Sequence, residues 1–362
     1  MKTVRVILSG GGTGGHLYPA LVLAEKLREL RPGVEIIHVG SRRPAELRIM
    51  AAGTTRFVAM RIEGLKGRGL RSLGGLLLLP GAFVQTLLLL LRFRPALVVG
   101  VGGFSSGPVV LLAAWAGIPT LVLEQNVRPG FTNRLLARWV RRAAVAFQAT
   151  LPAFRGKGLH LGNPVRPAFT TLPPKARDGR LSLLVCGGSQ GSAVINRAVV
   201  TALPLLAPVR GRLEIVHQTG VRDVDAVRRE YAQNGFAAVV EPFFEDMPAR
   251  FEAADLVLGR AGATTCAELA AAGKASILVP FAGAAENHQA LNAAALERAG
   301  GAEVLPEKAL NPLRLAERIR WYLSHPEALT AMELAVRRLA KPRAAEDIAA
   351  LALRLLDGGG QE

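Results

Sequence analysis

The chain has little cysteine and few aromatic side chains. Only two of its 362 residues are cysteines, Cys186 and Cys266, and they lie far apart inside apolar segments without the spacing of metal ligands. Neither a disulfide framework nor a zinc site is indicated, and a reducing cytoplasm fits the chain best. Residues 1–8 form a short apolar alternation that leads straight into glycines, so we expect no signal peptide.

Acidic residues are scarce in one half of the chain only. Of the formal net charge of +17, residues 1–165 contribute 22 Lys and Arg against 6 Asp and Glu, a net +16, whereas residues 166–362 contribute 23 against 22, a net +1. With 3 Trp and 3 Tyr in the whole chain, stacking platforms for bases are rare, so we predict no nucleic-acid partner. A negatively charged membrane surface or a lipid phosphate suits the basic half better.

Short runs of Val, Ile and Leu alternate with helix-length amphipathic stretches throughout the chain. This alternation is typical of parallel sheets covered by helices on both faces, so we predict an α/β fold. The strands that we expect are residues 4–8, 35–39, 97–101, 119–123 and, more weakly, 143–147, and then, in a second series, 181–185, 214–218, 237–240, 256–258 and 276–279. The two series predict one domain at residues 1–163 and another at 164–342, with a final helix at about 343–358 that packs back on the first domain.

Each half opens with a strand, a glycine loop and a helix. The first loop is residues 10–15 and the second is residues 187–191. Free backbone N–H groups and the positive dipole at such a helix start bind anions, so two of these units predict a ligand-binding cleft. The first loop also fits a dinucleotide fingerprint, but Arg42 and Arg43 follow the second strand, where NAD requires an acidic residue. An NADP enzyme stays open as an alternative.

Several polar residues have two interpretations, one in which they act on a ligand and one in which they only stabilise the fold. His16 stands where the first helix begins, as a general base or as a capping or packing residue. Glu268 follows the strand 256–258 and a turn of small residues, where it either accepts the hydroxyls of a ribose or is stabilised by the helix dipole alone. Asp223 and Asp225 match the Asp-x-Asp pattern of metal-dependent glycosyltransferases, but capping of the following helix explains them more simply, so we predict no metal.

A nearly all-apolar run covers residues 73–91 and carries arginines on both flanks. Its length would just span a bilayer. Against a span, Pro80 and Gln85 interrupt the run, and a crossing here would split one sheet across the membrane. A buried core helix and a segment resting on an anionic membrane are the other two interpretations. In the last of these, Trp115 adds an interfacial anchor.

Taken in order along the chain, these motifs resemble the MurG family of peptidoglycan N-acetylglucosaminyltransferases. The resemblance runs almost from end to end, and its most specific pieces are residues 10–16 with Pro19, 100–108, 124–126, 162–166, 187–191 and 262–268. It implies a GT-B fold of two facing Rossmann-like domains. It also implies transfer of N-acetylglucosamine (GlcNAc) from UDP-GlcNAc to the MurNAc 4-hydroxyl of lipid I, undecaprenyl-pyrophosphoryl-MurNAc-pentapeptide. The product is lipid II, the anomeric centre is inverted, and no cofactor or tightly bound metal is needed.

The resemblance also implies roles for individual residues. Those that would hold the UDP are Arg166, Ser189, Phe244, Ala263, Thr264, Thr265, Cys266, Ala267 and Glu268, with Glu268 on the ribose. Those that would line the donor side from the first domain are Thr13, Gly14, Gly15 and Asn126, while His288 and Gln289 would contact the transferred sugar. The lipid-linked pyrophosphate would lie on Gly102, Gly103, Phe104, Ser105 and Ser106. The base would be His16, with Glu124 as the alternative.

The implied partners are UDP-GlcNAc, lipid I, an anionic membrane surface and other proteins of cell-wall synthesis and division. The implied location is peripheral, on the cytoplasmic face of the bacterial cell membrane. Two alternatives stay open: a related GT-B enzyme that acts on another lipid acceptor, such as diacylglycerol, and a non-enzymatic membrane scaffold that binds a nucleotide sugar. Turnover with lipid I separates the three.

Overall fold

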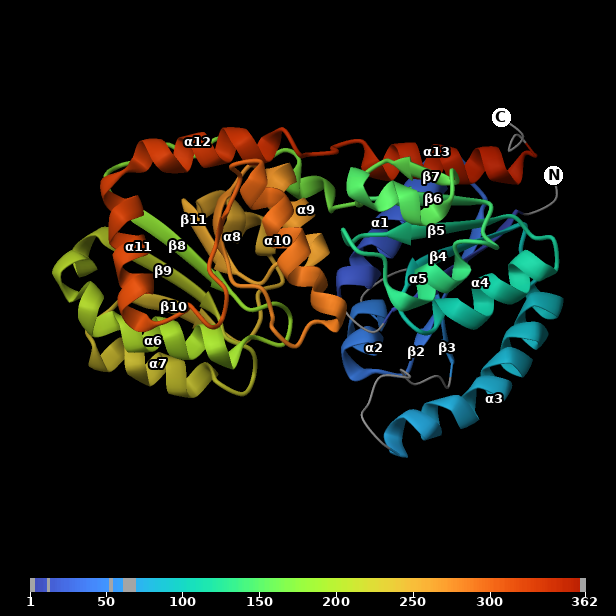
Figure 1. Cartoon of the computed structure of the whole chain (residues 1–362), viewed down its shortest axis with the longest axis horizontal. Coiled ribbons are helices and arrows are strands. Elements are labelled where there is room, and N and C mark those ends of the chain that lie inside the picture. The colour runs from blue at the N-terminus through green and yellow to red at the C-terminus, as the bar shows by residue number, and fades with distance from the viewer. Residues whose placement is uncertain (1–3, 12–13, 52–54, 61–69, 359–362) are drawn as a thin grey trace. The chain divides into compact units, whose positions relative to one another are not determined.

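The structure, a computed structural model, describes residues 4–11, 14–51, 55–60 and 70–358. The chain divides into two compact units, unit 1 with Met1–Arg166 and Lys341–Glu362, and unit 2 with Pro167–Ala340. Each unit is a parallel sheet flanked by helices (Figure 1). The predicted α/β class with two Rossmann-like domains is confirmed.

Unit 1 contains a seven-stranded sheet in the order β3-β2-β1-β4-β5-β6-β7. Its strands are β1 (Arg5–Gly10), β2 (Glu35–Ser41), β3 (Arg56–Met60), β4 (Leu97–Gly102), β5 (Thr120–Glu124), β6 (Arg142–Val145) and β7 (Gly158–His160). Its helices are α1 (Gly14–Leu30), α2 (Pro44–Ala51), α3 (Leu70–Phe93), α4 (Ser106–Trp115), α5 (Phe131–Leu136) and α13 (Ala344–Leu356), with the 3-10 helix η1 (Gln148–Phe154).

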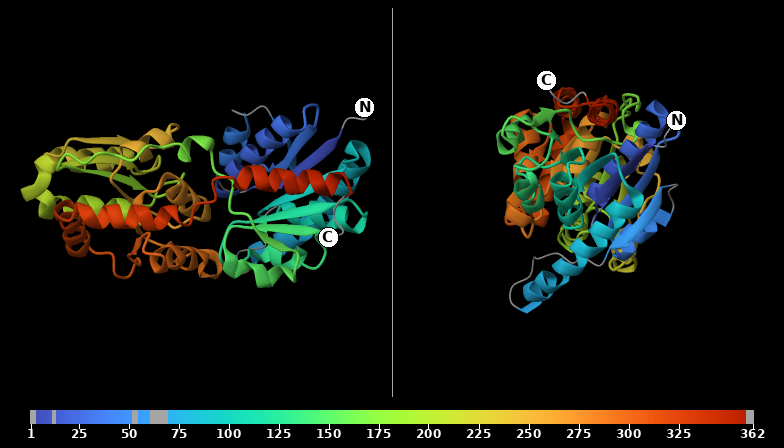
Figure 2. Two further views of the ribbon diagram at one scale, coloured as in Figure 1. Left: turned by 90° about the horizontal axis from the view of Figure 1, so that it is seen from above. Right: turned by 90° about the vertical axis from the view of Figure 1, so that its right-hand side faces the viewer.

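The two faces of the unit 1 sheet bury alternate residues of β1. Val6 and Leu8 pack with α1 and α13, whereas Ile7 belongs to the cluster on the other face with α3, α4 and α5. Because both faces are covered, the strands are apolar runs rather than polar–apolar alternations. Helix α13 places Ile348 and Leu351 in the same cluster as α1, so the C-terminal helix completes the core of unit 1 (Figure 2).

Unit 2 contains a six-stranded sheet in the order β10-β9-β8-β11-β12-β13. Its strands are β8 (Leu181–Cys186), β9 (Leu213–Gln218), β10 (Ala238–Glu241), β11 (Leu256–Gly259), β12 (Ala275–Leu278) and β13 (Glu303–Val304). Its helices are α6 (Ala193–Leu206), α7 (Val224–Gln233), α8 (Met247–Ala253), α9 (Ala263–Ala272), α10 (His288–Arg298), α11 (Pro312–Ser324) and α12 (Pro326–Arg337). The 3-10 helices are η2 (Pro167–Phe169), η3 (Ala207–Arg212) and η4 (Ala285–Asn287).

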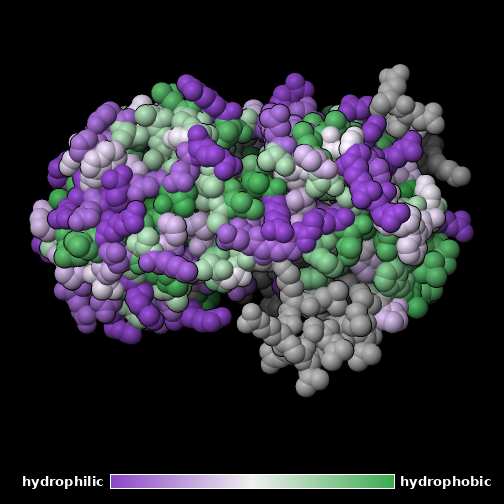
Figure 3. Space-filling view, in the orientation of Figure 1, coloured by the Kyte–Doolittle hydropathy of each residue, from purple (hydrophilic) through white to green (hydrophobic). Residues whose placement is uncertain are grey.

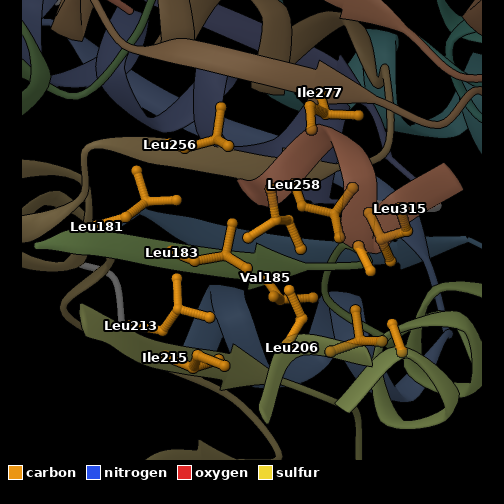
Figure 4. Packing of buried hydrophobic residues seen from close by; sticks show 14 of the residues in the cluster. Leu181, Leu183, Val185, Leu206, Leu213, Ile215, Leu256, Leu258, Ile277 and Leu315 are labelled. Carbon is orange, nitrogen blue, oxygen red and sulfur yellow. The ribbon is translucent and has the colours of Figure 1, made fainter. Parts of the chain in front are cut away.

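The core of unit 2 lies between its sheet and helices α6 and α11. Alternate residues of β8 and β11, among them Leu183 and Leu258, share one cluster with Leu206 and Leu315 (Figure 4). Helix α6 and η3 together form Ala193–Arg212, the one helical segment in the described part of the chain that is long and apolar enough to cross a membrane. Because α6 contributes six buried residues to this core, a core helix explains the segment, which is weak evidence for a span.

Each unit buries one histidine inside its sheet. His38 of β2 lies with Nε2 2.7 Å from the Gly10 carbonyl oxygen, and His217 of β9 lies with Nδ1 3.0 Å from the Tyr231 hydroxyl and Nε2 3.1 Å from Oδ1 of Asn196. Burial lowers the pKa of His38 to about 4, although the bond to Gly10 opposes the shift. Burial lowers the pKa of His217 to about 3. Both imidazoles are therefore neutral in the folded chain at neutral pH.

These two pKa shifts predict a loss of stability on mild acidification. Below the ordinary histidine pKa of 6.5 the unfolded chain binds protons that the folded chain excludes until its own pKa values, about 4 and about 3, are reached. The stabilisation is thus complete above pH 6.5 and decreases as the pH falls below it. We expect the free energy of unfolding, measured by urea denaturation, to fall by on the order of a few kcal/mol between about pH 7.5 and about pH 5. His217→Gln should flatten this dependence and His325→Gln should not; equal slopes in all three proteins would contradict it.

Candidate functional site

In both sheets the glycine loops follow the carboxyl ends of two neighbouring strands. In unit 1 the pair is β1 and β4, and in unit 2 it is β8 and β11. At each pair the strand order reverses direction, and open α/β sheets bind their ligands at such points. Each unit therefore presents one candidate binding edge.

The two loops of the unit 1 edge are in direct contact. The Gly11 N–H donates to the Gly102 carbonyl at 3.2 Å. Gly102 and Gly103 have φ of +98° and +83°, and a Cβ on Gly103 would lie 2.4 Å from the Gly11 oxygen, so only glycine fits there. Ser106 Oγ then donates to the Gly103 carbonyl at 2.8 Å. The residues predicted for the acceptor pyrophosphate thus lie against the first glycine loop.

His16 points its ring at this contact. A Cβ built on Gly102 would lie 2.7 Å from Cδ2 and 2.9 Å from Nε2 of the imidazole, so the ring packs directly on the Gly102 backbone. Helix α1 begins at Gly14, which places His16 inside the first turn. This position leaves open whether the ring acts as a base or supports the start of α1, and its contact with Gly102 adds a packing role. Gly15 lies beside it in the same turn, while Thr13 lies outside the described residues.

Glu124 is the hub of a buried network at the end of β5. Its Oε1 accepts the Asn126 backbone N–H at 3.0 Å and Asn126 Nδ2 at 3.2 Å, and its Oε2 accepts the Gly130 N–H at 2.9 Å and Asn133 Nδ2 at 2.8 Å. Burial raises the pKa of the Glu124 carboxyl, and these hydrogen bonds oppose that shift. With both oxygens occupied by donors, the geometry favours Glu124 as the residue that shapes the loop up to Asn133 rather than as a base.

Glu46 lies between the first glycine loop and the end of β2. Its side chain is buried, accepts the Ser41 N–H at 3.0 Å, and lies so close to Gly11 and Gly40 that a Cβ on either would overlap Oε1. An acidic side chain at this place is the opposite of the cationic group that the 2′-phosphate of NADP needs, so the contacts disfavour the NADP alternative.

The unit 2 edge carries two helix starts. Ser189 is exposed in the loop after β8, and Ser192 caps α6 by accepting the Ile195 N–H at 3.4 Å. Gly191, with φ of +73°, lies so close to Thr219 that a Cβ would fall 1.8 Å from the Thr219 oxygen. Three residues separate the end of β11 from the start of helix α9, whose run from Ala263 to Glu268 includes six of the nine residues predicted for the UDP. The two helices thus start after neighbouring strands, β8 and β11, and free N–H groups at helix starts bind anions such as a diphosphate.

Glu268 and the two cysteines lie together beneath the unit 2 edge. Burial, and after it the neighbouring Glu268 carboxylate, raises the pKa of the Cys186 thiol to about 12. Burial raises the pKa of the Cys266 thiol to about 12 as well. Both cysteines are free, buried and protonated at neutral pH, so neither is a nucleophile. Glu268 itself is half-buried in the second turn of α9.

Arg260 is a residue whose part in this edge the sequence motifs did not reveal. Its buried guanidinium donates to Ser192 Oγ at 2.7 Å and to the Val279 carbonyl at 3.0 Å. It also pairs with Glu307 and lies 5.3 Å from the centre of the Phe281 ring. It therefore ties the start of α6 to the chain that follows β12. The sequence feature that could have revealed this role is an arginine placed between a buried strand and Gly262.

The remaining predicted residues lie around these two edges. Gln289 accepts the Phe281 N–H at 3.0 Å, next to His288 at the start of α10. Phe244 is buried, its N–H donates to Gln218 Oε1 at 2.9 Å, and the Arg250 guanidinium lies over its ring. Arg166, where the first segment of unit 1 ends, places its guanidinium 4.9 Å from the centre of the Tyr18 ring.

The two aspartates of the Asp-x-Asp pattern lie at the start of α7. Asp225 is in the first turn, whereas Asp223 is at the N-cap position but makes no capping bond; its carboxylate accepts Asn196 Nδ2 at 2.7 Å instead. The predicted capping role is thus wrong for the Asp223 side chain, because Asn196 competes for it. Within the described ranges, no group of three or more His, Cys, Asp or Glu is arranged to hold a metal ion.

Comparison with known families decides what kind of protein carries these edges. The N-terminal domain of glycosyltransferase family 28 matches residues 6–145, and the C-terminal domain of the same family matches residues 182–348. The chain belongs to glycosyltransferase family 28. The first match includes the glycine loops of unit 1, and the second includes those of unit 2.

Curated relatives within the family match almost the whole chain. A protein of Syntrophus aciditrophicus is 45% identical over 350 residues, which are 96% of this chain and 97% of the relative. That relative is named UDP-N-acetylglucosamine–N-acetylmuramyl-(pentapeptide) pyrophosphoryl-undecaprenol N-acetylglucosamine transferase. The crystal structure of MurG from Acinetobacter baumannii superposes with a TM-score of 0.78 at 29% identity, covering 97% of this chain and 99% of that one.

The fold alone is shared more widely. UDP-GlcNAc 2-epimerase from Neisseria meningitidis, solved with UDP-GlcNAc, gives a TM-score of 0.68 at 13% identity and covers 97% of this chain and 100% of its own. At that identity the likeness concerns the fold only. The family match, not the fold, therefore separates a glycosyltransferase from an epimerase.

Proposed function

We propose that this enzyme transfers GlcNAc from UDP-GlcNAc to the 4-hydroxyl of MurNAc in lipid I, giving lipid II. The observation that carries the proposal is the near full-length similarity, at 45% identity, to a curated relative named for this reaction. The acceptor oxygen attacks the anomeric carbon from the face opposite UDP. The new C–O bond forms as the bond to the diphosphate breaks, the electron pair leaves with UDP, and the hydroxyl proton passes to a base.

In this proposal unit 2 binds the donor. The helix starts of α6 and α9 face the diphosphate, with Ser189 in the loop before α6. Backbone N–H groups aimed at a departing phosphate stabilise its developing charge without a metal ion. Glu268 accepts the ribose hydroxyls, and His288 and Gln289 contact the sugar. Arg260 supports the donor edge by bridging Ser192 and Val279.

Unit 1 binds the acceptor in this proposal. The loop from Gly102 to Ser106 receives the lipid-linked pyrophosphate, and His16, packed on Gly102, is the base. Asn126, which lines the donor side from unit 1 in this proposal, is held by Glu124 at the same carboxyl edge of the sheet. Glu124 then acts as a positioning residue for that loop.

A transfer assay tests the function directly. Labelled GlcNAc should move from UDP-GlcNAc to a lipid I analogue, and UDP-galactose with diacylglycerol should give no product. Transfer to diacylglycerol alone would favour the related lipid glycosyltransferase. UDP-GlcNAc binding with no transfer would favour the non-enzymatic scaffold, and conversion of the sugar without any acceptor would indicate an epimerase.

We propose further that unit 1 rests on an anionic membrane through α3, α4 and α5. In the described second half of α3, Ala82, Thr86 and Leu90 are buried. The opposite stripe, Val84, Leu87, Leu88 and Leu91, is exposed by 47–61%, so this half is not a purely buried helix. An apolar stripe facing solvent at this spacing is typical of an interfacial helix.

Neighbouring helices extend this apolar surface. Trp115 at the end of α4 is 57% exposed and stacks edge-on against Trp139 at 5.8 Å, and Leu135 of α5 is 59% exposed. Figure 3 shows hydrophobic residues gathered at the margin of unit 1 over α3 and α4. Arg92 and Arg138 are exposed beside them, and Arg138 lies over the Trp139 ring. Aromatic and basic side chains around an apolar stripe favour a negatively charged lipid surface.

Replacing Leu87 and Leu91 together with serine should weaken vesicle binding. Two exposed leucines that enter lipid contribute on the order of a kcal/mol each, so we expect at least a roughly tenfold loss. Co-sedimentation with phosphatidylglycerol vesicles measures it, and added salt should weaken binding of the unchanged protein. Leu334→Ser, at an equally exposed leucine of α12, is the matched control. Identical sedimentation of all three proteins would rule the surface out.

A further inference from the structure

Gln125, which follows β5, has a buried side-chain amide in which the nitrogen is hydrogen-bonded and, within the described part of the chain, the oxygen is not. It is 3% exposed, and its Nε2 donates to the Val101 carbonyl at 3.0 Å. Because a carbonyl can only accept, this bond fixes which end of the amide is nitrogen. The other end, Oε1, is therefore an oxygen held in one direction.

That oxygen is left without a donor. Across the described residues, Oε1 of Gln125 is shielded from solvent and accepts no hydrogen bond. A buried acceptor without a partner costs roughly 1–3 kcal/mol, so native proteins rarely keep one without a use. The neighbouring carboxylate of Glu124 offers a contrast, because all of its donors are in place.

The oxygen is directed at the same point as the imidazole of His16. A Cβ built on Gly102 would lie 3.6 Å from Gln125 Oε1 and 2.9 Å from His16 Nε2. Both atoms thus border the place that a Cβ of residue 102 would take, so a side chain there would crowd both. The absence of a side chain at position 102, where φ is +98°, leaves the ring and the amide free to meet.

We propose that Gln125 is the positioning residue of the base: its Oε1 accepts the Nε2–H of His16. This tautomer leaves the lone pair on Nδ1 to take the proton of the attacking hydroxyl. After the transfer the imidazolium keeps Nε2–H on Gln125, and the charge is balanced by the departing diphosphate. The inference rests on the proposed function. Catalytic hydrogen bonds often tighten only when substrate binds, which accounts for an acceptor that still lacks its donor.

A neutral amide suits this position. A neighbouring side chain that accepts a hydrogen bond from the ring fixes which imidazole nitrogen carries the proton. An amide does this without placing a negative charge beside the pyrophosphate of the acceptor substrate. Glu124 cannot supply the contact, because its oxygens are held by Asn126, Gly130 and Asn133. Gln125 is the described side chain that combines burial, a fixed amide and an open acceptor next to His16.

Two substitutions separate positioning from mere packing. Gln125→Glu keeps an acceptor oxygen, Gln125→Met removes it, and both lose the amide N–H that binds Val101. We expect Gln125→Met to lower kcat by about ten- to a hundredfold, a part of what a general base contributes, with the KM for UDP-GlcNAc unchanged. Gln125→Glu should lose clearly less activity than Gln125→Met, because it keeps the acceptor, although its negative charge beside the acceptor pyrophosphate costs part of the turnover. Equal losses in both variants would assign Gln125 a purely structural role and overturn the proposal.

The tautomer of His16 is a readout independent of turnover. In protein labelled with ¹⁵N-histidine, the His16 signals, assigned by their loss in His16→Ala, should show a protonated Nε2 and an unprotonated Nδ1. Gln125→Met should give a mixture of tautomers and Gln125→Glu should not. A protonated Nδ1 in the unchanged protein would overturn the proposal even if Gln125→Met failed to fold. Failure of the unchanged protein to transfer GlcNAc would refute the proposed function instead and leave this readout intact.

Discussion

Replacing His16 with alanine is expected to lower kcat by about 10²–10⁴-fold, the usual contribution of a general base. The ring packs on Gly102, beside the loop proposed for the acceptor, whereas the helix starts proposed for UDP belong to unit 2. Steady-state transfer to a lipid I analogue measures kcat, and calorimetry measures UDP affinity. We expect UDP affinity to stay close to that of the unchanged protein.

Added imidazole provides the control for this substitution. If the ring of His16 takes the hydroxyl proton, free imidazole in the cavity left by His16→Ala should restore part of the turnover. Unchanged turnover in His16→Ala would remove this residue from the chemistry. A loss of UDP affinity equal to the loss of kcat would show that the substitution disturbs donor binding instead.

The sequence predicts the longer strands of both sheets because their burial on two faces makes them uninterrupted apolar runs. β1, β4, β8 and β11 fall within one or two residues of their expected bounds. β3, β7 and β13 escape prediction for a physical reason. β7 is the three residues Gly158–His160 and β13 is the two residues Glu303–Val304, too short to form a pattern, and each pairs at the rim of a sheet.

The candidate site is predictable where it depends on the backbone. Glycine is required at positions such as Gly103 and Gly191, where φ is positive and another strand's loop lies close, so the loops can be found from the sequence. Contacts between side chains depend on which strands become neighbours. Glu46 meets Gly11 only because β2 pairs with β1, and Gln125 and His16 border the same glycine, Gly102, only because β4 lies between β1 and β5. Such contacts between residues far apart in the chain follow from the order of the strands in the sheet, and no sequence motif records them.

Replacing Glu124 is expected to cost both stability and activity. Glu124→Ala would remove the acceptor of four hydrogen bonds, two of them from Asn126, and each buried donor left unsatisfied costs roughly 1–3 kcal/mol. Glu124→Gln preserves the shape of the side chain but replaces one of its two oxygens by an NH₂ group. Because each oxygen accepts two hydrogen bonds, the NH₂ group faces two donors in either orientation of the amide. We therefore expect a lower urea midpoint in both variants, together with a loss of kcat of at least about tenfold, since Asn126 and Asn133 lose their support.

This pair of substitutions distinguishes the two roles open to Glu124. A catalytic base would lose activity in Glu124→Gln while the urea midpoint stayed near that of the unchanged protein. A positioning residue would lose both together, and Asn133→Ala would reproduce part of the effect by removing one donor to Oε2. Because the carboxylate accepts from Asn126, Gly130 and Asn133 at once, we expect the second result. In that case proton transfer depends on His16, and the loop that ends at Asn133 depends on Glu124.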